Sequence, residues 1–437
     1  MSSASCDWVG GRGAPVQGDI VVPGDKSVSH RAVMLAALAD GSSRIEGFLE
    51  GEDTRATAAV FARMGVRCDA PEAGVRMVHG VGIDGLRAPA APLDCGNAGT
   101  AMRLLAGLLC AQPFDSVLVG DASLSRRPMR RVIDPLARMG ARIDSDEGFP
   151  PLRIHGGQRL AGIDTMLPVA SAQVKSALLL AGLQAAGDTV VREPHPTRDY
   201  TESMLCAFGV DIDFAPGFAR LRGGQRLRAT DIQVPTDFSS AAFFLVAASL
   251  VPGSLLRIRN VGMNPRRTGL LQALRSMGAD IGEERCAASA SGEAVADLIV
   301  RHAPLHGVEL PTALVPDMID EFPALFVAAA CASGETLVRG AAELRVKESD
   351  RIATMASGLR ALGIEVHETP DGARIHGGRL SGGTIESHGD HRVAMAFAVA
   401  AQLADGEVRI GDIANVATSF PGFDRLARQV GFGLRDA

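Results

Sequence analysis

The chain is poor in aromatic side chains and has no long apolar run. Only 4% of its 437 residues are Phe, Trp or Tyr, so its core must be packed from Ala, Val, Leu and Ile. The longest apolar stretches, such as 241–251 and 324–332, are too short to span a bilayer. No apolar signal segment precedes a cleavage site near the N-terminus. We therefore expect a soluble protein with no membrane partner.

Cysteine pairs and net positive charge are lacking as well. The seven cysteines are odd in number and at least 15 residues apart, which excludes a disulfide framework and a zinc ribbon. We therefore predict a cytoplasmic location. With 50 acidic against 44 basic residues the net charge is −6, which disfavours a general nucleic-acid binder. Any anionic partner must be bound by local basic groups.

One sequence pattern recurs six times, at intervals of 68 to 85 residues: the end of a helix, a Gly, and a stretch of alternating apolar and polar residues. Gly suits the left-handed position just past a helix, and alternation with a period of two is typical of a half-buried strand. Each copy therefore predicts a helix, a Gly cap and a strand. The six glycines are Gly65, Gly140, Gly209, Gly278, Gly363 and Gly431.

A polar turn that opens an Ala-rich apolar helix recurs in step with this pattern. A helix that is apolar on all sides is buried, and one short repeat cannot close a core alone. We predict an α/β protein of two domains, 25–236 and 1–24 with 237–437, each with three repeats around shared buried helices. The first strand is expected to complete the last repeat. The six turns start at Gly24, Gly96, Ser171, Thr236, Pro316 and His388.

Cations and small hydroxyls gather where these helices begin. A helix N-terminus offers unpaired N–H groups and a positive dipole end, which suit phosphate or carboxylate. On equivalent positions of several repeats, such groups predict a site for a small polyanion. They are Lys26, Ser27, Arg31, Asn97, Gly99, Thr100, Arg103, Arg126, Arg127, Ser171, Gln173, Lys175, Arg198, Lys347, Arg351, His391 and Arg392.

Two stretches add acids to this cationic setting. PDMIDEFP brings Asp317, Asp320 and Glu321 to a helix start, and RVKESDR holds Glu348 among cations. A carboxylate beside Lys or Arg acts as a base, whereas a desolvated one can hold a proton and act as an acid. A proton donor and an acceptor are therefore both available. For Asp237 and Asp320 we expect a simpler role as helix N-caps.

Motifs for metals and common cofactors are missing. His388, Asp390 and His391 are potential metal ligands, but Arg392 beside them would oppose a cation and no further spacing completes a ligand set. There is no Walker loop, dinucleotide fingerprint or nucleophile elbow. We therefore expect no metal and no cofactor, and the kinase, dehydrogenase and hydrolase classes are disfavoured.

Seven motifs, in their order along the chain, resemble the 5-enolpyruvylshikimate-3-phosphate synthase family of enolpyruvyl transferases. The resemblance extends from about Gly18 to Phe423 and implies a two-domain inside-out α/β barrel. Each domain would have three βαβαββ units, with the active site in the cleft between the domains. The motifs are GDKSVSHR, LDCGNAGTAMR, GDASLSRRPM, VASAQVKSALLLAGL, PDMIDEFP, ELRVKESDR and HGDHRVAMAF.

The implied reaction belongs to the shikimate pathway, which leads through chorismate to the aromatic amino acids. It transfers the enolpyruvyl group of phosphoenolpyruvate to the 5-hydroxyl of shikimate 3-phosphate and releases phosphate through a tetrahedral intermediate. The resemblance also implies inhibition by glyphosate at the phosphoenolpyruvate site, where Gly99 would limit the room. We expect a monomer that binds only these small molecules.

The resemblance assigns residues to each part of the site. Asp317 would accept the hydroxyl proton, Glu348 would exchange protons with the methylene group, and Lys26 would assist catalysis. Shikimate 3-phosphate would contact Lys26, Ser27, Arg31, Ser171, Gln173, Arg198, Asp317 and Lys347. Phosphoenolpyruvate would contact Lys26, Asn97, Gly99, Arg127, Gln173, Arg351, His391 and Arg392.

Four positions depart from patterns found in the family. Thr418 stands where many members carry a lysine, and Leu104 stands where many have proline. Thr197 and Ala172 replace a tyrosine and a second serine of some members. These differences resemble a more divergent branch of the family.

Two alternative functions remain open from the sequence. The sister transferase that acts on UDP-N-acetylglucosamine shares the fold, but it carries a catalytic cysteine where this chain has Ala122, and no Cys lies between Cys110 and Cys206. A six-repeat clamp around nucleic acid would spread Lys and Arg along helix faces, whereas here they cluster with acids at helix starts.

Overall fold

The computed structural model describes residues 7–285 and 293–437 of the chain. Among these residues, those of Met1–Pro23, Thr236–Ala287 and Ala294–Ala437 form one compact unit, called the Asp317 unit below. Gly24–Pro235 form the other, the Lys26 unit, together with Glu293. The chain crosses between the units one residue before each boundary predicted from the sequence. Every helix of the described chain is too short or too polar to span a bilayer.

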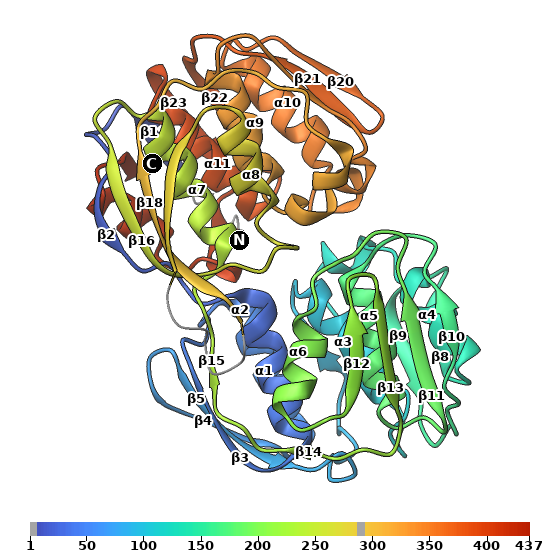
Figure 1. Cartoon of the computed structure of the whole chain (residues 1–437). Coiled ribbons are helices and arrows are strands. Elements are labelled where there is room, and N and C mark those ends of the chain that lie inside the picture. The colour runs from blue at the N-terminus through green and yellow to red at the C-terminus, as the bar shows by residue number, and fades with distance from the viewer. Residues whose placement is uncertain (1–6, 286–292) are drawn as a thin grey trace, which may run out of the picture. The chain divides into compact units, whose positions relative to one another are not determined.

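Three apolar helices form the inside of the Lys26 unit: α1 (Lys26–Leu38), α3 (Gly99–Leu109) and α5 (Ala172–Gly182) (Figure 1). From Val28 to Leu38 every side chain of α1 is buried. Helices α3 and α5 pack so closely that a Cβ at Gly107 would lie 2.0 Å from the Ala177 carbonyl oxygen. The outer, amphipathic helices are α2 (Glu52–Arg63), α4 (Arg130–Arg138) and α6 (Tyr200–Ala207).

The sheets of the Lys26 unit share one topology, in which a parallel pair is followed by an antiparallel hairpin. The orders are β14-β3-β5-β4, with β15 also on β3, then β6-β7-β9-β8 and β10-β11-β13-β12. The strands are β3 (Ala39–Glu46), β4 (Arg67–Glu72), β5 (Val75–Val81), β6 (Leu93–Asp94), β7 (Ser116–Val119), β8 (Arg142–Asp146), β9 (Phe149–His155), β10 (Asp164–Met166), β11 (Asp188–Arg192), β12 (Ile212–Ala215), β13 (Phe218–Arg222), β14 (Leu227–Arg228) and β15 (Ile232–Gln233).

The Asp317 unit repeats this plan. Its inner helices are α7 (Phe238–Leu250), α9 (Phe322–Cys331) and α11 (His391–Ala401), with strands outside them (Figure 1). Its outer helices are α8 (Gly269–Ser276), α10 (Arg351–Ala361) and α12 (Phe423–Gln429). The strands are β1 (Trp8–Gly11), β2 (Gln17–Ile20), β16 (Leu255–Gly262), β17 (Asp280–Arg285), β18 (Val295–Arg301), β19 (Glu335–Val338), β20 (Val366–Thr369), β21 (Gly372–His376), β22 (Ser381–Glu386), β23 (Asp405–Gly411) and β24 (Gly433–Asp436).

The first strand completes the last repeat, as predicted. β1 lies between β23 and β24 and pairs antiparallel with both, so Trp8 is opposite Ile410 and Asp436. The other sheets of this unit are ordered β17-β18-β16-β2 and β19-β21-β20. Sheets outside and apolar helices inside make each unit an inside-out α/β barrel.

The six repeat glycines are confirmed as left-handed caps. Their φ angles are 92° at Gly65, 99° at Gly140, 82° at Gly209, 101° at Gly278, 87° at Gly363 and 115° at Gly431. A strand follows each of them: β4, β8, β12, β17, β20 and β24. The repeat pattern therefore predicted the chain's local structure correctly at all six places.

Candidate active site

The start of α1 places two predicted cations one turn apart. Asp25 caps the helix, since its carboxylate accepts a hydrogen bond from the Val28 N–H at 2.8 Å. Lys26, in the first turn, pairs with Asp53 at 2.5 Å. The Arg31 guanidinium reaches back to the Ser27 carbonyl at 3.0 Å. The cap thus fixes the direction in which Lys26, Ser27 and Arg31 are presented.

Arg31 is buried, and its guanidinium donates hydrogen bonds to uncharged groups. Its guanidinium donates to Thr201 Oγ1 at 2.7 Å and to Ser176 Oγ at 2.9 Å. Burial, and then the charge of Arg198, lower the pKa of Arg31 to about 10. An anion beside these two guanidinium groups would stabilise their charged forms and so raise the pKa of Arg31 again. Both residues are among those assigned from the sequence to shikimate 3-phosphate, an anionic ligand.

The start of α3 brings three predicted phosphoenolpyruvate residues together. Arg127 donates to Asn97 Oδ1 at 2.6 Å and to Ser123 Oγ at 3.3 Å. A Cβ built on Gly99 would lie 3.1 Å from Arg127 Nη1 and 3.2 Å from Arg103 Nη1. The hydrogen at Gly99 therefore leaves room for both guanidinium groups at this helix N-terminus.

The start of α5 adds Gln173 to the same group. The Gln173 amide accepts from Arg103 Nη1 at 2.7 Å and donates to Thr100 Oγ1 at 2.9 Å. Ser171 is the N-cap of α5, and its hydroxyl lies 3.4 Å from the Val174 N–H.

Lys175 does not belong to the polyanion site, contrary to the sequence prediction. Its side chain is 2% exposed and its ammonium lies 2.8 Å from both Glu193 and Glu202. Burial would lower the pKa of Lys175, but the two carboxylates outweigh it and raise that pKa. The charge of Lys175 is thus neutralised by ion pairs inside the unit.

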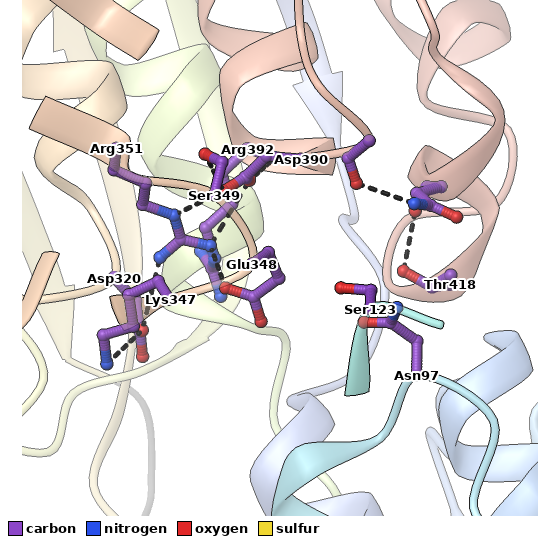
Figure 2. A network of polar contacts seen from close by, with 12 residues as sticks. Asn97, Ser123, Asp320, Lys347, Glu348, Ser349, Arg351, Asp390, Arg392 and Thr418 are labelled. Atoms are coloured by element: carbon purple, nitrogen blue, oxygen red, sulfur yellow. Dashed lines mark hydrogen bonds and ion pairs between the residues drawn. The ribbon is translucent and has the colours of Figure 1, made fainter. Parts of the chain in front are cut away.

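In the Asp317 unit, Arg351 lies between Glu348 and Asp390 (Figure 2). It donates to Glu348 Oε2 at 2.7 Å and to Asp390 Oδ2 at 2.8 Å. Burial alone would lower the pKa of Arg351, but the Asp390 and Glu348 carboxylates hold it above the ordinary value. Arg351 therefore stays charged and fixes the Glu348 carboxylate.

Asp390 joins this ion pair to the start of α11. Its carboxylate also accepts from the Arg392 N–H at 3.0 Å and so caps the helix. The side chains of His391 and Arg392 are both buried at this N-terminus. Lys347 lies nearby, 3.8 Å from Asp320 and 3.3 Å from Glu343. Five predicted residues therefore lie in one network or next to it: Lys347, Glu348, Arg351, His391 and Arg392.

The PDMIDEFP stretch does not begin α9 directly. A short 3-10 turn, Pro316–Met318, contains Asp317, and α9 starts only at Phe322. Asp320 is therefore not an N-cap, and that prediction is wrong. Its carboxylate instead accepts from Arg267 at 2.9 Å. Asp237 does cap its helix, through the Ser239 N–H at 2.9 Å.

Arg267 and Arg266 are residues that the sequence analysis missed. Arg267 is 3% exposed and also pairs with Asp237, at 3.1 Å. Arg266 Nη1 lies 3.1 Å from Asp317 Oδ2, and the Asp317 side chain is 7% exposed. The signal was present as two consecutive arginines just before an outer helix, the same pattern as Arg126 and Arg127 before α4.

Two of the four positions that depart from the family pattern, Thr418 and Thr197, form local hydrogen bonds. The Thr418 hydroxyl donates to the Asn415 carbonyl at 2.6 Å, so no cation stands there. Thr197 binds Glu193 through its hydroxyl, at 2.5 Å, and through its N–H, at 3.2 Å. Ala172 and Leu104 are buried.

Comparison with known proteins places the chain in a family. Residues 11–426 match the family model described as EPSP synthase (3-phosphoshikimate 1-carboxyvinyltransferase). The 3-phosphoshikimate 1-carboxyvinyltransferase of Xanthomonas axonopodis pv. citri (strain 306) is 72% identical over all of this chain and 99% of its own. That of Xanthomonas campestris pv. campestris (strain B100) is 71% identical over 99% of each chain.

The fold agrees with this assignment. A solved EPSP synthase from Acinetobacter baumannii superposes with a TM-score of 0.88 at 49% identity, and the match covers 100% of both chains. These relatives favour the main prediction over the UDP-sugar transferase and the nucleic-acid clamp. The chain belongs to the EPSP synthase (3-phosphoshikimate 1-carboxyvinyltransferase) family.

Proposed function

We propose that the residues described above carry out the reaction of this family, enolpyruvyl transfer from phosphoenolpyruvate to the 5-hydroxyl of shikimate 3-phosphate. The observation that carries the proposal is the pairing of each candidate proton-transfer group with a guanidinium. Glu348 lies 2.7 Å from Arg351, and Asp317 lies 3.1 Å from Arg266. Such pairs hold two carboxylates in fixed positions, as an acid and a base acting on one substrate pair require.

The two carboxylates divide the proton transfers between them. Glu348 starts the reaction as the carboxylic acid, with one oxygen still accepting from Arg351, and delivers its proton to the methylene carbon of phosphoenolpyruvate. The 5-hydroxyl oxygen attacks the adjacent cationic carbon while its proton passes to the Asp317 carboxylate. The resulting tetrahedral intermediate then loses phosphate. A methyl proton returns to Glu348, the proton on Asp317 leaves with the phosphate, and both residues regain their starting state.

The cations bind the negative charge of both substrates. In the Lys26 unit, the residues that bind shikimate 3-phosphate are Lys26, Ser27, Arg31, Ser171, Gln173 and Arg198. Those that bind phosphoenolpyruvate are Asn97, Gly99 and Arg127, together with Lys26 and Gln173, which belong to both sets. In the Asp317 unit, Lys347 serves shikimate 3-phosphate, while Arg351, His391 and Arg392 complete the phosphoenolpyruvate set. Buried guanidinium groups suit this task because a bidentate fork matches phosphate and carboxylate. We further propose a cytoplasmic monomer that binds neither nucleic acid nor membranes.

Phosphate release on mixing the chain with both substrates tests the function directly. We expect turnover only when both are present, and no loss after EDTA treatment, because side chains supply the positive charge that a metal would otherwise provide. Each substrate alone serves as the control. Activity that EDTA abolishes and a divalent cation restores would contradict the proposed charge assignment, and no phosphate release at all would contradict the function.

Glyphosate should inhibit in competition with phosphoenolpyruvate, and Gly99→Ala should weaken that inhibition. The added methyl group would contact the ends of Arg127 and Arg103, both flexible, at 3.1 and 3.2 Å. Arg127 must then shift, so KM for phosphoenolpyruvate should rise as well. The affinity for the longer inhibitor should fall by about tenfold more than the affinity for the substrate, because one misplaced contact costs about 1–3 kcal/mol of binding free energy.

Inhibition curves at several phosphoenolpyruvate concentrations measure both effects. Gly96→Ala is not a useful control because Gly96 has a φ of 56°. Gly11→Ala is better matched, since nothing lies within 4 Å of a Cβ there. An insensitive parent enzyme, or equal losses for inhibitor and substrate in Gly99→Ala, would show that Gly99 does not set the room for the inhibitor.

A further inference from the structure

The turn that opens α8 lies against the segment that carries Asp317. Its conformation is fixed by Asn264, whose side chain accepts from the Arg266 N–H at 2.9 Å and whose carbonyl accepts from the Arg267 N–H at 2.8 Å. A Cβ built on Gly269 would lie 3.0 Å from the carbonyl carbon of Asp317. A side chain at this position would push the Asp317 backbone away by a few tenths of an ångström, so Gly269 suits the close approach of the turn to Asp317.

Two consecutive arginines of this turn contact two acids of the facing segment. Arg267 is buried and pairs with Asp320 and Asp237, at 2.9 and 3.1 Å. Arg266 is 35% exposed, and its guanidinium lies 3.1 Å from the carboxylate of Asp317. Arg267 therefore ties the segment to the core, while Arg266 contacts the acid that receives the hydroxyl proton in the proposed reaction.

We propose that Arg266 is a positioning residue for Asp317, which it orients and keeps ionised in the free enzyme. The inference rests on the proposed function, in which Asp317 must be a carboxylate to accept the hydroxyl proton. A guanidinium at hydrogen-bond distance favours the charged form of a carboxylate and limits its rotation. Arg266 belongs to none of the residue sets assigned above to the substrates.

The other charges of this neighbourhood pair largely among themselves. Asp320 is shared by Arg267 at 2.9 Å, Lys347 at 3.8 Å and Arg351 at 3.8 Å. Arg267 also pairs with Asp237 at 3.1 Å and lies 3.9 Å from Glu321, a buried acid whose pKa is raised by burial. Replacing Arg266 would therefore remove the guanidinium 3.1 Å from Asp317 and leave the ion pairs of Asp320 and Asp237 in place.

Arg266→Ala should move the acid limb of the pH profile of kcat/KM. Without the guanidinium the Asp317 carboxylate takes up a proton at higher pH, so activity falls earlier as the pH is lowered. We expect the midpoint of the limb to rise by about one unit, which corresponds to a loss of about tenfold at pH values below both midpoints. The kcat/KM profile is the suitable measure because it reports the free enzyme. Ionisation of the substrates is the same for parent and variant and cancels in the comparison.

Two further variants separate charge from packing. Arg266→Lys retains a cation but not the planar fork, so its limb should lie between those of the parent and Arg266→Ala. Arg275→Ala is the matched control, because Arg275 lies on α8, is 40% exposed and pairs with Glu283 at 2.7 Å. Its acid limb should coincide with that of the parent enzyme.

Asp317→Asn distinguishes failure of the inference from failure of the proposed function. If Asp317→Asn retains turnover, Asp317 is not the proton acceptor and the proposed function is wrong at that step. If Asp317→Asn is inactive and Arg266→Ala keeps the parental acid limb, the inference alone is wrong. An equal loss at every pH, with a lower melting temperature, would make Arg266 merely structural and would also overturn it. A rise in KM for shikimate 3-phosphate without a moved limb would make Arg266 a substrate ligand instead.

Discussion

Glu348→Gln should lose turnover by about 10²-fold or more while both substrates still bind. The Gln amide oxygen can accept the same hydrogen bond from Arg351, which lies 2.7 Å from Glu348 in the parent chain. The site therefore keeps its shape and its cations. A neutral amide cannot deliver a proton to the methylene carbon or take one back, so the chemical step fails. Steady-state rates and calorimetric binding of shikimate 3-phosphate measure the two effects separately.

The matched control for this variant is Glu368→Gln. Glu368 lies in the same unit, is 28% exposed against 21% for Glu348, and also pairs with an arginine, Arg360, at 2.9 Å. It lies on β20 and has no assigned role, so its turnover should equal that of the parent. If Glu348→Gln keeps near-parental turnover, Glu348 does not transfer protons. If it loses binding and turnover equally, Glu348 acts through the position of Arg351.

Lys175→Met should destabilise the Lys26 unit by about 3–5 kcal/mol. Lys175 is the buried cation that two buried carboxylates share, with Glu193 and Glu202 both 2.8 Å away. Methionine has a similar length and no charge, so both carboxylates would be left in the core without their cation. Chemical denaturation of parent and variant measures the loss. A change smaller than about 1 kcal/mol would mean that water reaches the carboxylates and that this ion pair network contributes little.

The pH dependence of this loss has a definite sign. Burial raises the pKa of Glu202 even in the parent, and removal of Lys175 takes away the group that lowers it. A carboxyl whose pKa is raised by folding favours the folded state at low pH and loses that contribution as the pH rises through the folded value. Lys175→Met should therefore be less destabilised at pH 5 than at pH 8. Adding Glu202→Gln to the variant should recover part of the stability, and a double variant no more stable than the single one would contradict this account.

The sequence by itself determined the repeat architecture. The pattern around Gly140 or Gly278 needs only local rules, because a residue without Cβ past a helix end and an alternating strand after it are set by neighbouring residues. The burial of α7 followed in the same way from a helix with no polar face. Seven motifs in order were enough to indicate the family, which the relatives then confirmed.

The tertiary structure decided which cations belong to the candidate site and which form ion pairs with acids inside the core. Lys175 had the same sequence signature as Lys26, yet its charge is taken by two acids within the core. Arg267 and Asp320 lie 53 residues apart in the sequence, and Arg266 and Asp317 lie 51 apart. No sequence period links such partners, because a buried charge pairs with whichever opposite charge the packing of separate elements brings within hydrogen-bond distance. The site's cationic composition was therefore readable from the sequence, but the ion pairs that hold its two proton-transfer acids in place were set by tertiary packing.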